Sequence, residues 1–490
     1  MHFDGKAITL RSLDPNDPAC VYSTVIDGFG SGSTLIFDSG EDANSVLDGL
    51  TLRGLGRSSI SCAIKCRNSS PTIRNCVIKN SLAPWALGGG GINCYNGSSL
   101  IEDCMIYTNL GGVESGSGIT LWGEQDPNSR PIVSNCVIKC NIAPYGGGIE
   151  CDGVNAVIQN CAIVANDSNY PGHQGIYGNL GGAIFVSNST VDIRNCIIWK
   201  NKAYAGPQLT VADISGTSSR VTVSYCNIQG GKHNVLVAPD LYDWYDGLPI
   251  DQNLAEQMLI WGPGNVDIDP LFALEPHDGG DGWFNNWTTE PDETLNNIYG
   301  DLHLKSQSGR FLCKDFDLAD FNYDGIINLI DLALFVNHFL GSVHQPGYWP
   351  FNLQQDTAID LKDLAVLIDR YLYERPTTQW VFDDITSPCI DAGDPNSPWT
   401  AELSPHGKRI NMGAFGNTSQ AGMSLSSAGN IANLDNDPLD SVDFLDLEQL
   451  IQKWLDENVL LSEDLNRDGI VSLPDYAVFA EQWTSTSSAP

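Results

Sequence analysis

The sequence predicts a parallel β-solenoid, and three observations support this prediction. A short segment, in which a cysteine follows Asn or Asp and precedes an apolar run, recurs about every 30 residues. A second row of cysteine, leucine or valine residues lies upstream of the first row and keeps its register. Connectors rich in glycine and of varying length separate the copies, and this composition does not suit helical repeats. Each copy is therefore interpreted as one coil of a stack.

The first row consists of the lead cysteines, which are Cys76, Cys104, Cys136, Cys161 and Cys196. Apolar residues stand three positions before each lead cysteine (Ile73, Ile101, Val133, Ile158 and Ile193) and two positions after it (Ile78, Ile106, Ile138, Ile163 and Ile198). In a straight strand these two sets would lie on opposite faces. The residue directly before the cysteine is Asn75, Asp103, Asn135, Asn160 or Asn195. Asn and Asp tolerate left-handed backbone geometry, so we predict a bend here that turns both apolar sets inward.

The second row lies ten residues before the first in most coils and consists of Cys66, Cys94, Leu121, Cys151 and Val186. Because cysteine exchanges with leucine and valine, this row is interpreted as interior, with cysteine acting as a small buried hydrophobe. Stacked parallel strands lie about 4.8 Å apart, so disulfides between neighbouring coils are an alternative. None of the 14 cysteines stands in a zinc-binding spacing with histidine.

These rows and the glycine-rich connectors resemble the bacterial right-handed parallel β-helix repeat proteins, the pectin-lyase-like fold, over residues 1–275. The resemblance implies a three-sided helix with stacked Asn, Ile and Cys ladders. Residues 1–10 resemble the stretch that, in this family, follows an export signal and a first coil. An extracellular or cell-surface location is implied, with the export signal missing from this chain.

Charge and hydropathy exclude two classes of partner. The net charge is −35, whereas proteins that bind nucleic acids need basic surfaces. No apolar run reaches about 18 residues, so no membrane span is expected. The acidic excess suits a cation-binding or halotolerant extracellular protein.

Two segments fit the pattern of a calcium loop, in which oxygen ligands recur at alternate positions, glycine makes the turn and one backbone carbonyl contributes. The ligands of the first loop would be Asp320, Asn322, Asp324, Ile326 through its carbonyl, Asn328 and Asp331. The ligands of the second loop would be Asp464, Asn466, Asp468, Ile470 through its carbonyl, Ser472 and Asp475. A pattern typical of an apolar helix follows each loop. We therefore expect each loop to bind one Ca²⁺.

A loop followed by a single helix, with Asp in place of Glu at the last ligand position, resembles the dockerin type I repeat. Each strong loop has a weaker partner, at residues 352–363 and 433–446. In the first of these Thr357 replaces the turn glycine, and in the second the spacing is off by two. A solvated acidic turn is the alternative interpretation for both. Paired repeats resemble complete dockerin modules, and this resemblance implies a cohesin-like domain as the partner.

The predicted organisation is mainly β, with small EF-hand-like helical modules. Residues 1–275 form the right-handed parallel β-helix, and residues 276–311 and 379–425 form a C-terminal β segment. Residues 312–378 form a dockerin-like module inserted into that segment, and residues 426–490 form a second module at the C-terminus.

The outer face of the solenoid offers several candidate residues but no recognisable catalytic motif of a lyase or a galacturonase. The aromatic rings of Tyr107 and Trp199 could stack on sugars, and two groupings of charged side chains are conceivable. These groupings are Glu102 with Arg74, and Glu150 and Asp152 with Asp103. An ordinary solvated face is the alternative.

Two functions remain open. The first is a polysaccharide-associated surface protein or complex component that docks through its calcium modules. The second is a polysaccharide-degrading enzyme, a lyase or an O-glycosyl hydrolase, which the same modules target to a complex.

Overall fold

The computed structural model describes residues 1–28, 32–54, 62–81, 89–112, 116–123, 128–169, 178–213, 219–276, 300–312, 329–336, 361, 364, 380–426, 431–435, 442–457 and 460–483. Within these residues, no helix combines the length and the apolar character that a membrane span needs.

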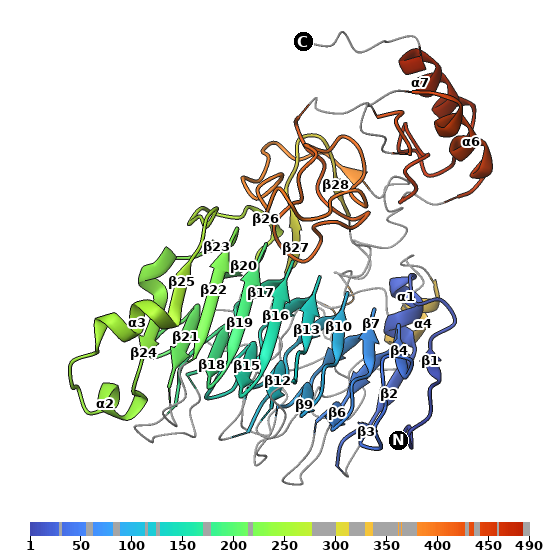
Figure 1. Ribbon diagram of the computed structural model, residues 1–490. Helices are drawn as coiled ribbons and strands as arrows, with labels where there is room; N and C mark the ends of the chain where they lie inside the picture. Colours follow the sequence, from blue (N-terminus) through green and yellow to red (C-terminus); the bar gives the residue numbers. More distant parts are fainter. Residues whose placement is uncertain are drawn as a thin grey trace.

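Three parallel β-sheets form the body of the molecule, and each coil of the chain contributes one strand to each sheet (Figure 1). Sheet I has nine strands: β1 (Thr9–Arg11), β4 (Val46–Asp48), β7 (Thr72–Arg74), β10 (Leu100–Glu102), β13 (Ile132–Ser134), β16 (Asn155–Gln159), β19 (Thr190–Arg194), β22 (Arg220–Ser224) and β25 (Leu259–Trp261). Sheet II has eight strands: β2 (Val25–Asp27), β5 (Thr51–Arg53), β8 (Val77–Lys79), β11 (Met105–Tyr107), β14 (Val137–Lys139), β17 (Ala162–Val164), β20 (Ile197–Trp199) and β23 (Asn227–Ile228). Sheet III also has eight strands: β3 (Leu35–Phe37), β6 (Ile64–Arg67), β9 (Ile92–Tyr95), β12 (Ile119–Trp122), β15 (Ile149–Asp152), β18 (Ile184–Ser187), β21 (Leu209–Ala212) and β24 (Val235–Ala238). The predicted solenoid is confirmed.

From β4 onward, a two-residue corner joins each strand of sheet I to the next strand of sheet II. β10 ends at Glu102 and β11 begins at Met105, so only Asp103 and Cys104 make the turn. The predicted left-handed bend is confirmed, because φ is 52° at Asn75, 51° at Asp103, Asn135 and Asn160, and 54° at Asn195. Ile101 before the corner and Ile106 after it are both fully buried. The bend therefore turns both apolar sets inward.

Both predicted cysteine rows are interior. The backbone register pairs Leu121 with Cys94 and with Cys151, and all three residues are buried. At the corner, the Cys104 thiol donates weak hydrogen bonds to the carbonyl oxygens of Glu102 at 3.2 Å and of Ile73 at 3.6 Å. The thiol thus fills a small apolar site and also supplies a donor beside the bend. All of the described cysteines are free, so the disulfide alternative does not apply to them.

Short helices cover parts of this body. Helix α1 (Pro18–Ser23) packs against sheet II, where Val21 contacts Val77 and Tyr107. The last coils carry η1 (Gly231–Asn234), α2 (Leu241–Tyr245) and α3 (Gln252–Met258), and Met258 of α3 joins the solenoid core.

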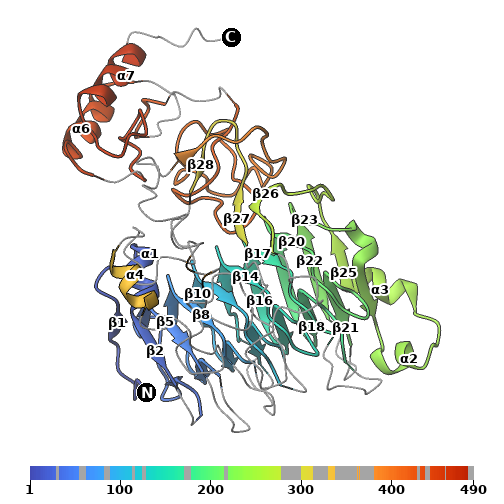
Figure 2. The ribbon, with the colours of Figure 1, turned by 180° about the vertical axis from the view of Figure 1, so that it is seen from behind.

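A C-terminal β segment covers the outer face of sheet II over its later strands, β14, β17 and β20 (Figures 1 and 2). In this segment β26 (Phe272–Leu274) pairs with β27 (Asp301–Leu304), and β28 (Arg310–Phe311) pairs with β29 (Trp380–Val381), both antiparallel. The chain continues without regular strands to residue 426. Leu302 and Met412 pack against Ile197 of sheet II, and Gly413 N donates to Asn195 O at 2.8 Å. Sheet II is therefore sandwiched between the solenoid interior and this segment.

Helices α6 (Phe444–Gln452) and α7 (Leu473–Trp483) form a small C-terminal module, drawn in red in Figure 1. Its core consists of Ala432, Leu434, Leu450, Leu465, Val471 and Phe479. A further helix, α4 (Leu329–Val336), stands at residues where the sequence predicts the helix after the first calcium loop.

Candidate functional site

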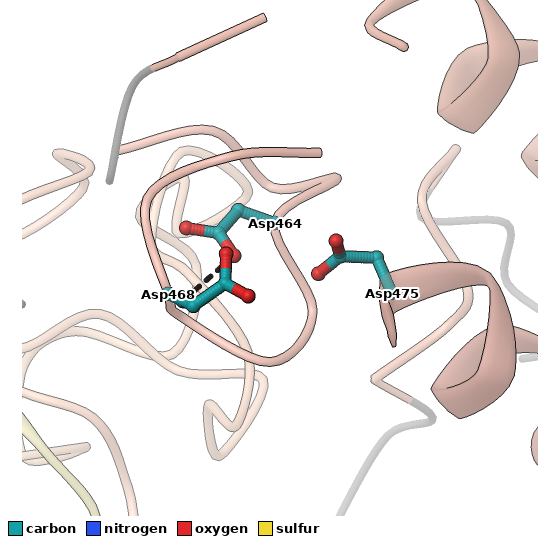
Figure 3. Close-up of side chains that lie close together, drawn as sticks. All are labelled: Asp464, Asp468 and Asp475. Carbon is teal, nitrogen blue, oxygen red and sulfur yellow. Dashed lines mark hydrogen bonds between the residues drawn. The ribbon is translucent and has the colours of Figure 1, made fainter. Parts of the chain in front are cut away.

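Three carboxylates converge where the loop before α7 meets the first turn of that helix (Figure 3). The carboxylate oxygens of Asp464, Asp468 and Asp475 lie within 4.8 Å of one another. Asp464 and Asp475 are fully buried, whereas Asp468 is exposed. In the part of the chain that the structure describes, this is the one group of three or more His, Cys, Asp or Glu side chains that could hold a metal ion.

The loop closes on itself through hydrogen bonds to its first and last acidic residues. Asp464 accepts from Asp468 N at 3.1 Å and from Gly469 N at 2.9 Å. Gly469 has a φ of 97°, which side-chain-bearing residues rarely adopt, so glycine is needed at this turn. Asp475, at the start of α7, accepts from Asn466 N at 3.0 Å and from Ser472 N at 2.7 Å. These bonds place the two buried carboxylates on opposite sides of one centre.

The electrostatics of this loop favour a bound cation. Burial raises the pKa of Asp464, and the neighbouring carboxylates of Asp475 and Asp468 raise it further, while the hydrogen bond from Gly469 N and the charge of Arg467 oppose the rise. A hard divalent cation would be attracted to the same oxygens and would remove the repulsion between them. Asn466, Ile470 and Ser472 stand at the remaining ligand positions of the same loop. The donor set is composed of oxygens, as calcium requires.

The loop at 433–446 closes on its last aspartate in the same way as the loop at 464–475. Asp446 accepts from Asp435 N at 3.0 Å and from Asp443 N at 2.8 Å, as Asp475 accepts from Asn466 N and Ser472 N. Its third donor is Leu434 N at 2.6 Å. The two extra residues noted in the sequence fall between Asp435 and Asp443, so they leave this closure intact. The module is therefore built from two halves with the same loop closure.

The remaining predicted ligands are not described by the structure. Asp320, Asn322, Asp324, Ile326 and Asn328 of the first loop lie outside the described residues, and Asp331 is described only as a backbone position in α4. The weak loop at 352–363 also lies outside the described residues, apart from the backbone of Leu361.

Comparison with known protein families supports the β-helix. Residues 30–253 match the family model for the right-handed beta helix region. This part of the chain is a right-handed parallel β-helix. Comparison with curated proteins gave no match, and comparison with solved structures gave none either.

The aromatic residues on the β-helix face are not available for stacking on sugars, contrary to the sequence-based expectation. Trp199 is 8% exposed and Tyr107 is 6% exposed. The C-terminal β segment covers the outer face around Trp199, and α1 covers the face around Tyr107. Sequence reasoning missed this burial because the covering residues lie far away in the chain.

One charged grouping was predicted correctly and the other was not. Glu102 lies opposite Arg74 in the register of sheet I, although the Arg74 guanidinium bonds Asp48 through Nε and Nη2. Glu150 and Asp152 belong to β15 of sheet III, whereas Asp103 stands at the corner between sheets I and II. The expected group of Glu150, Asp152 and Asp103 is therefore wrong, because the intervening residues place them in different sheets.

A groove with a volume of about 430 Å³ runs along the corner beside Asp103. Its floor includes Asn75, Asp103 and Asn135, and its walls come from α1, sheet II, the C-terminal β segment and Leu460 of the C-terminal module. His303 of the β segment lies in one wall.

His303 is held in place by both of its ring nitrogens. Nδ1 lies 2.6 Å from Asp301 Oδ1 and Nε2 lies 3.2 Å from Gln420 Oε1. Its ring stacks on Phe415 with the centroids 3.6 Å apart. Burial raises the pKa of Asp301, but His303 and Arg310 outweigh this effect and lower it overall. These contacts make His303 a rigid part of the groove wall.

Proposed function

We propose that this protein is a β-helix that binds calcium through its C-terminal module and docks on a partner protein through that module. The observation that carries the proposal is the convergence of Asp464, Asp468 and Asp475 within 4.8 Å, in a loop whose spacing fits a calcium loop. The second calcium site of the proposal is the loop at 320–331.

The partner surface in this proposal lies at the start of both helices of the module. Phe444 at the start of α6 is 76% exposed, and Leu473 at the start of α7 is 70% exposed. Each lies two residues before the aspartate that closes its loop, Asp446 or Asp475. Large apolar side chains at matching exposed positions are typical of protein-binding surfaces. The resemblance to dockerin repeats supports a cohesin-like domain as the partner, and an extracellular, polysaccharide-associated role for the complex.

Calcium binding can be tested by isothermal titration of the full chain after removal of divalent cations. We expect two sites in the native protein and one site in the Asp464→Ala variant. Asp456→Ala is the matched control, because Asp456 pairs with Lys453 on the exposed surface and lies outside the loop. A native protein that takes up no calcium at millimolar concentration would reject the proposal.

Docking can be tested by measuring binding of the calcium-loaded full chain to a panel of cohesin domains. The double variant Phe444→Asp, Leu473→Asp should lose any binding that the native protein shows. The control Leu13→Asp changes a residue that is 91% exposed in the first coil, and it should bind as the native protein does. Equal binding by the double variant would place the partner surface elsewhere.

A further inference from the structure

The asparagine ladder consists of the residues that directly precede the lead cysteines at the corner, namely Asn75, Asp103, Asn135, Asn160 and Asn195. Where the ladder is regular, each side-chain amide donates to the oxygen of the preceding coil. Asn195 Nδ2 donates to Asn160 Oδ1 at 3.1 Å, and Asn160 Nδ2 donates to Asn135 Oδ1 at 3.4 Å.

The ladder is interrupted on both sides of Asp103. A carboxylate has no N–H, so Asp103 cannot donate to Asn75. Asn135 Nδ2 donates instead to Ala414 O at 3.2 Å and to Gly416 O at 2.8 Å in the C-terminal β segment. In the described part of the chain, no hydrogen bond reaches the Asp103 carboxylate or Asn75 Oδ1.

This surplus of acceptors lies at the floor of the 430 Å³ groove. The walls near it are mainly apolar and include Tyr22, Met105 and Phe415. Partial loss of water raises the pKa of Asp103 to about 7, even though its side chain is exposed to the groove. The nearest guanidinium, that of Arg74, is already bonded to Asp48.

We propose that this groove binds a ligand that carries an ammonium group on an apolar body, with the ammonium between Asp103 and Asn75. An ammonium has three N–H donors. The two carboxylate oxygens of Asp103 and Asn75 Oδ1 supply three acceptors. A cavity of this size suits a small molecule or one side chain. A free amine and a lysine side chain share this chemistry.

The test uses the full chain at pH 8, above the pKa of Asp103, with two pairs of probes. The first pair is benzylamine and its neutral analogue benzyl alcohol. The second pair is the tripeptide Gly-Lys-Gly, acetylated at its N-terminus and amidated at its C-terminus, and the same capped tripeptide with norleucine in place of lysine. We expect the charged member of at least one pair to bind at least about tenfold more tightly, as a charge-assisted hydrogen bond provides. The pair that shows the larger preference identifies the source of the amine.

Three variants separate ligand binding from stability. Asp103→Asn should lose the amine preference and should melt at the same temperature or higher, because the new amide can donate to Asn75. Asn160→Asp interrupts the ladder away from the groove, so it should melt lower and keep the preference. Met105→Lys places an ammonium in the groove wall and should block the amine while Asp103 is unchanged.

Three results would overturn the inference. They are equal binding of the charged and neutral probes in both pairs, an amine preference that survives in Asp103→Asn, and a lower melting temperature for Asp103→Asn. The first two would show that Asp103 does not recognise an ammonium. The third would show that the carboxylate is part of the fold itself.

Discussion

Arg467 of the acidic loop donates a hydrogen bond from Nη2 to the carbonyl oxygen of Ser404, at 2.9 Å. Ser404 belongs to the C-terminal β segment, so this bond ties the candidate calcium loop to the part of the chain that covers the β-helix. Nη1 of the same guanidinium donates to Leu461 O at 2.8 Å. Burial lowers the pKa of Arg467 to about 10, while the charges of Asp464, Asp475 and Glu463 oppose the fall. The loop that gathers the carboxylates therefore also positions the module.

Replacing Arg467 should release the module from the β segment. Each hydrogen bond to a charged group contributes about 1.5–3 kcal/mol, and Arg467→Ala removes two of them. We expect a larger maximum dimension in solution X-ray scattering, with the melting of the β-helix unchanged. The control Lys453→Ala removes only an exposed ion pair with Asp456. An unchanged scattering profile for Arg467→Ala would show that other contacts hold the module.

Chelation of divalent cations should unfold the helical modules and spare the β-helix. Without a cation the carboxylates of the acidic loop repel one another, so binding and folding are linked. Circular dichroism should report loss of helical signal while the β signal persists. Calorimetry should show the module transition move to lower temperature on adding chelator. Loss of the β-helix transition under the same conditions would mean that the metal lies elsewhere.

Replacing Asp446 should destabilise the module as much as replacing Asp475, irrespective of whether the loop at 433–446 binds a cation. Its carboxylate accepts three backbone N–H groups, from Leu434, Asp435 and Asp443. Leaving a buried donor unsatisfied costs roughly 1–3 kcal/mol. Asp446→Ala should therefore unfold the module at 25 °C or lower its melting temperature by many degrees. Asp446→Asn keeps one acceptor oxygen and should be milder, and equal stability of all three proteins would contradict the loop closure described above.

Stability should fall as the pH rises to about 8, because of Glu150. Burial raises the pKa of this carboxyl to about 8, although a hydrogen bond from Gly116 N opposes the rise. Its pKa in the unfolded chain is about 4.3. The contribution of the protonated group is thus complete below about pH 4.3, is lost progressively as the pH rises from there to about 8, and changes no further at higher pH.

Glu150→Gln tests this dependence, because glutamine keeps an acceptor for Gly116 N and does not ionise. Its melting temperature should lie close to that of the native protein at pH 4 and exceed it at pH 9. Glu256→Gln, at an exposed position of α3, serves as the control. A native protein that melts no lower at pH 9 than at pH 6 would show that the fold does not raise the pKa of Glu150.

The corner cysteines should be protected and should contribute to stability. Cys136 is fully buried, and its thiol donates to Ser134 O at 3.2 Å. Thiol labelling of Cys104, Cys136 and Cys161 should be slow until denaturant is added. Cys136→Ala should lower the free energy of unfolding by about 1–2 kcal/mol in a denaturant titration. Fast labelling of these three residues in the native protein would place the row on the surface.

The corner could be predicted from the sequence because a left-handed backbone favours particular residue types. Asn135 and Cys136 carry the information for their own turn, and no distant residue is needed to interpret them. The oxygen spacing from Asp464 to Asp475 is local in the same way. Patterns of this kind are visible in one segment of chain.

Features that depend on distant segments were missed for the opposite reason. The burial of Trp199 depends on the C-terminal β segment. The residues of the strand that it covers do not indicate that it is there. The role of Arg467 depends on Ser404 and occupies a loop position that the calcium pattern does not constrain. The hydrogen bonds that Asp446 accepts from Asp435 N and Asp443 N could not be predicted. Two additional residues shift the spacing of the side-chain oxygens in the sequence without altering these bonds.

Because the corner between sheets I and II has a constant length, insertions can be confined to other links of the chain. From β4 onward, every turn from sheet I to sheet II is two residues long, whereas the links from sheet II to sheet III differ in length from coil to coil. Compare Lys139 to Ile149 with Val164 to Ile184. An insertion in one link does not change the position of the next corner, and therefore does not change the register of any later coil. Evolution or a protein engineer can therefore change the variable links loop by loop, while the corner between sheets I and II stays in alignment.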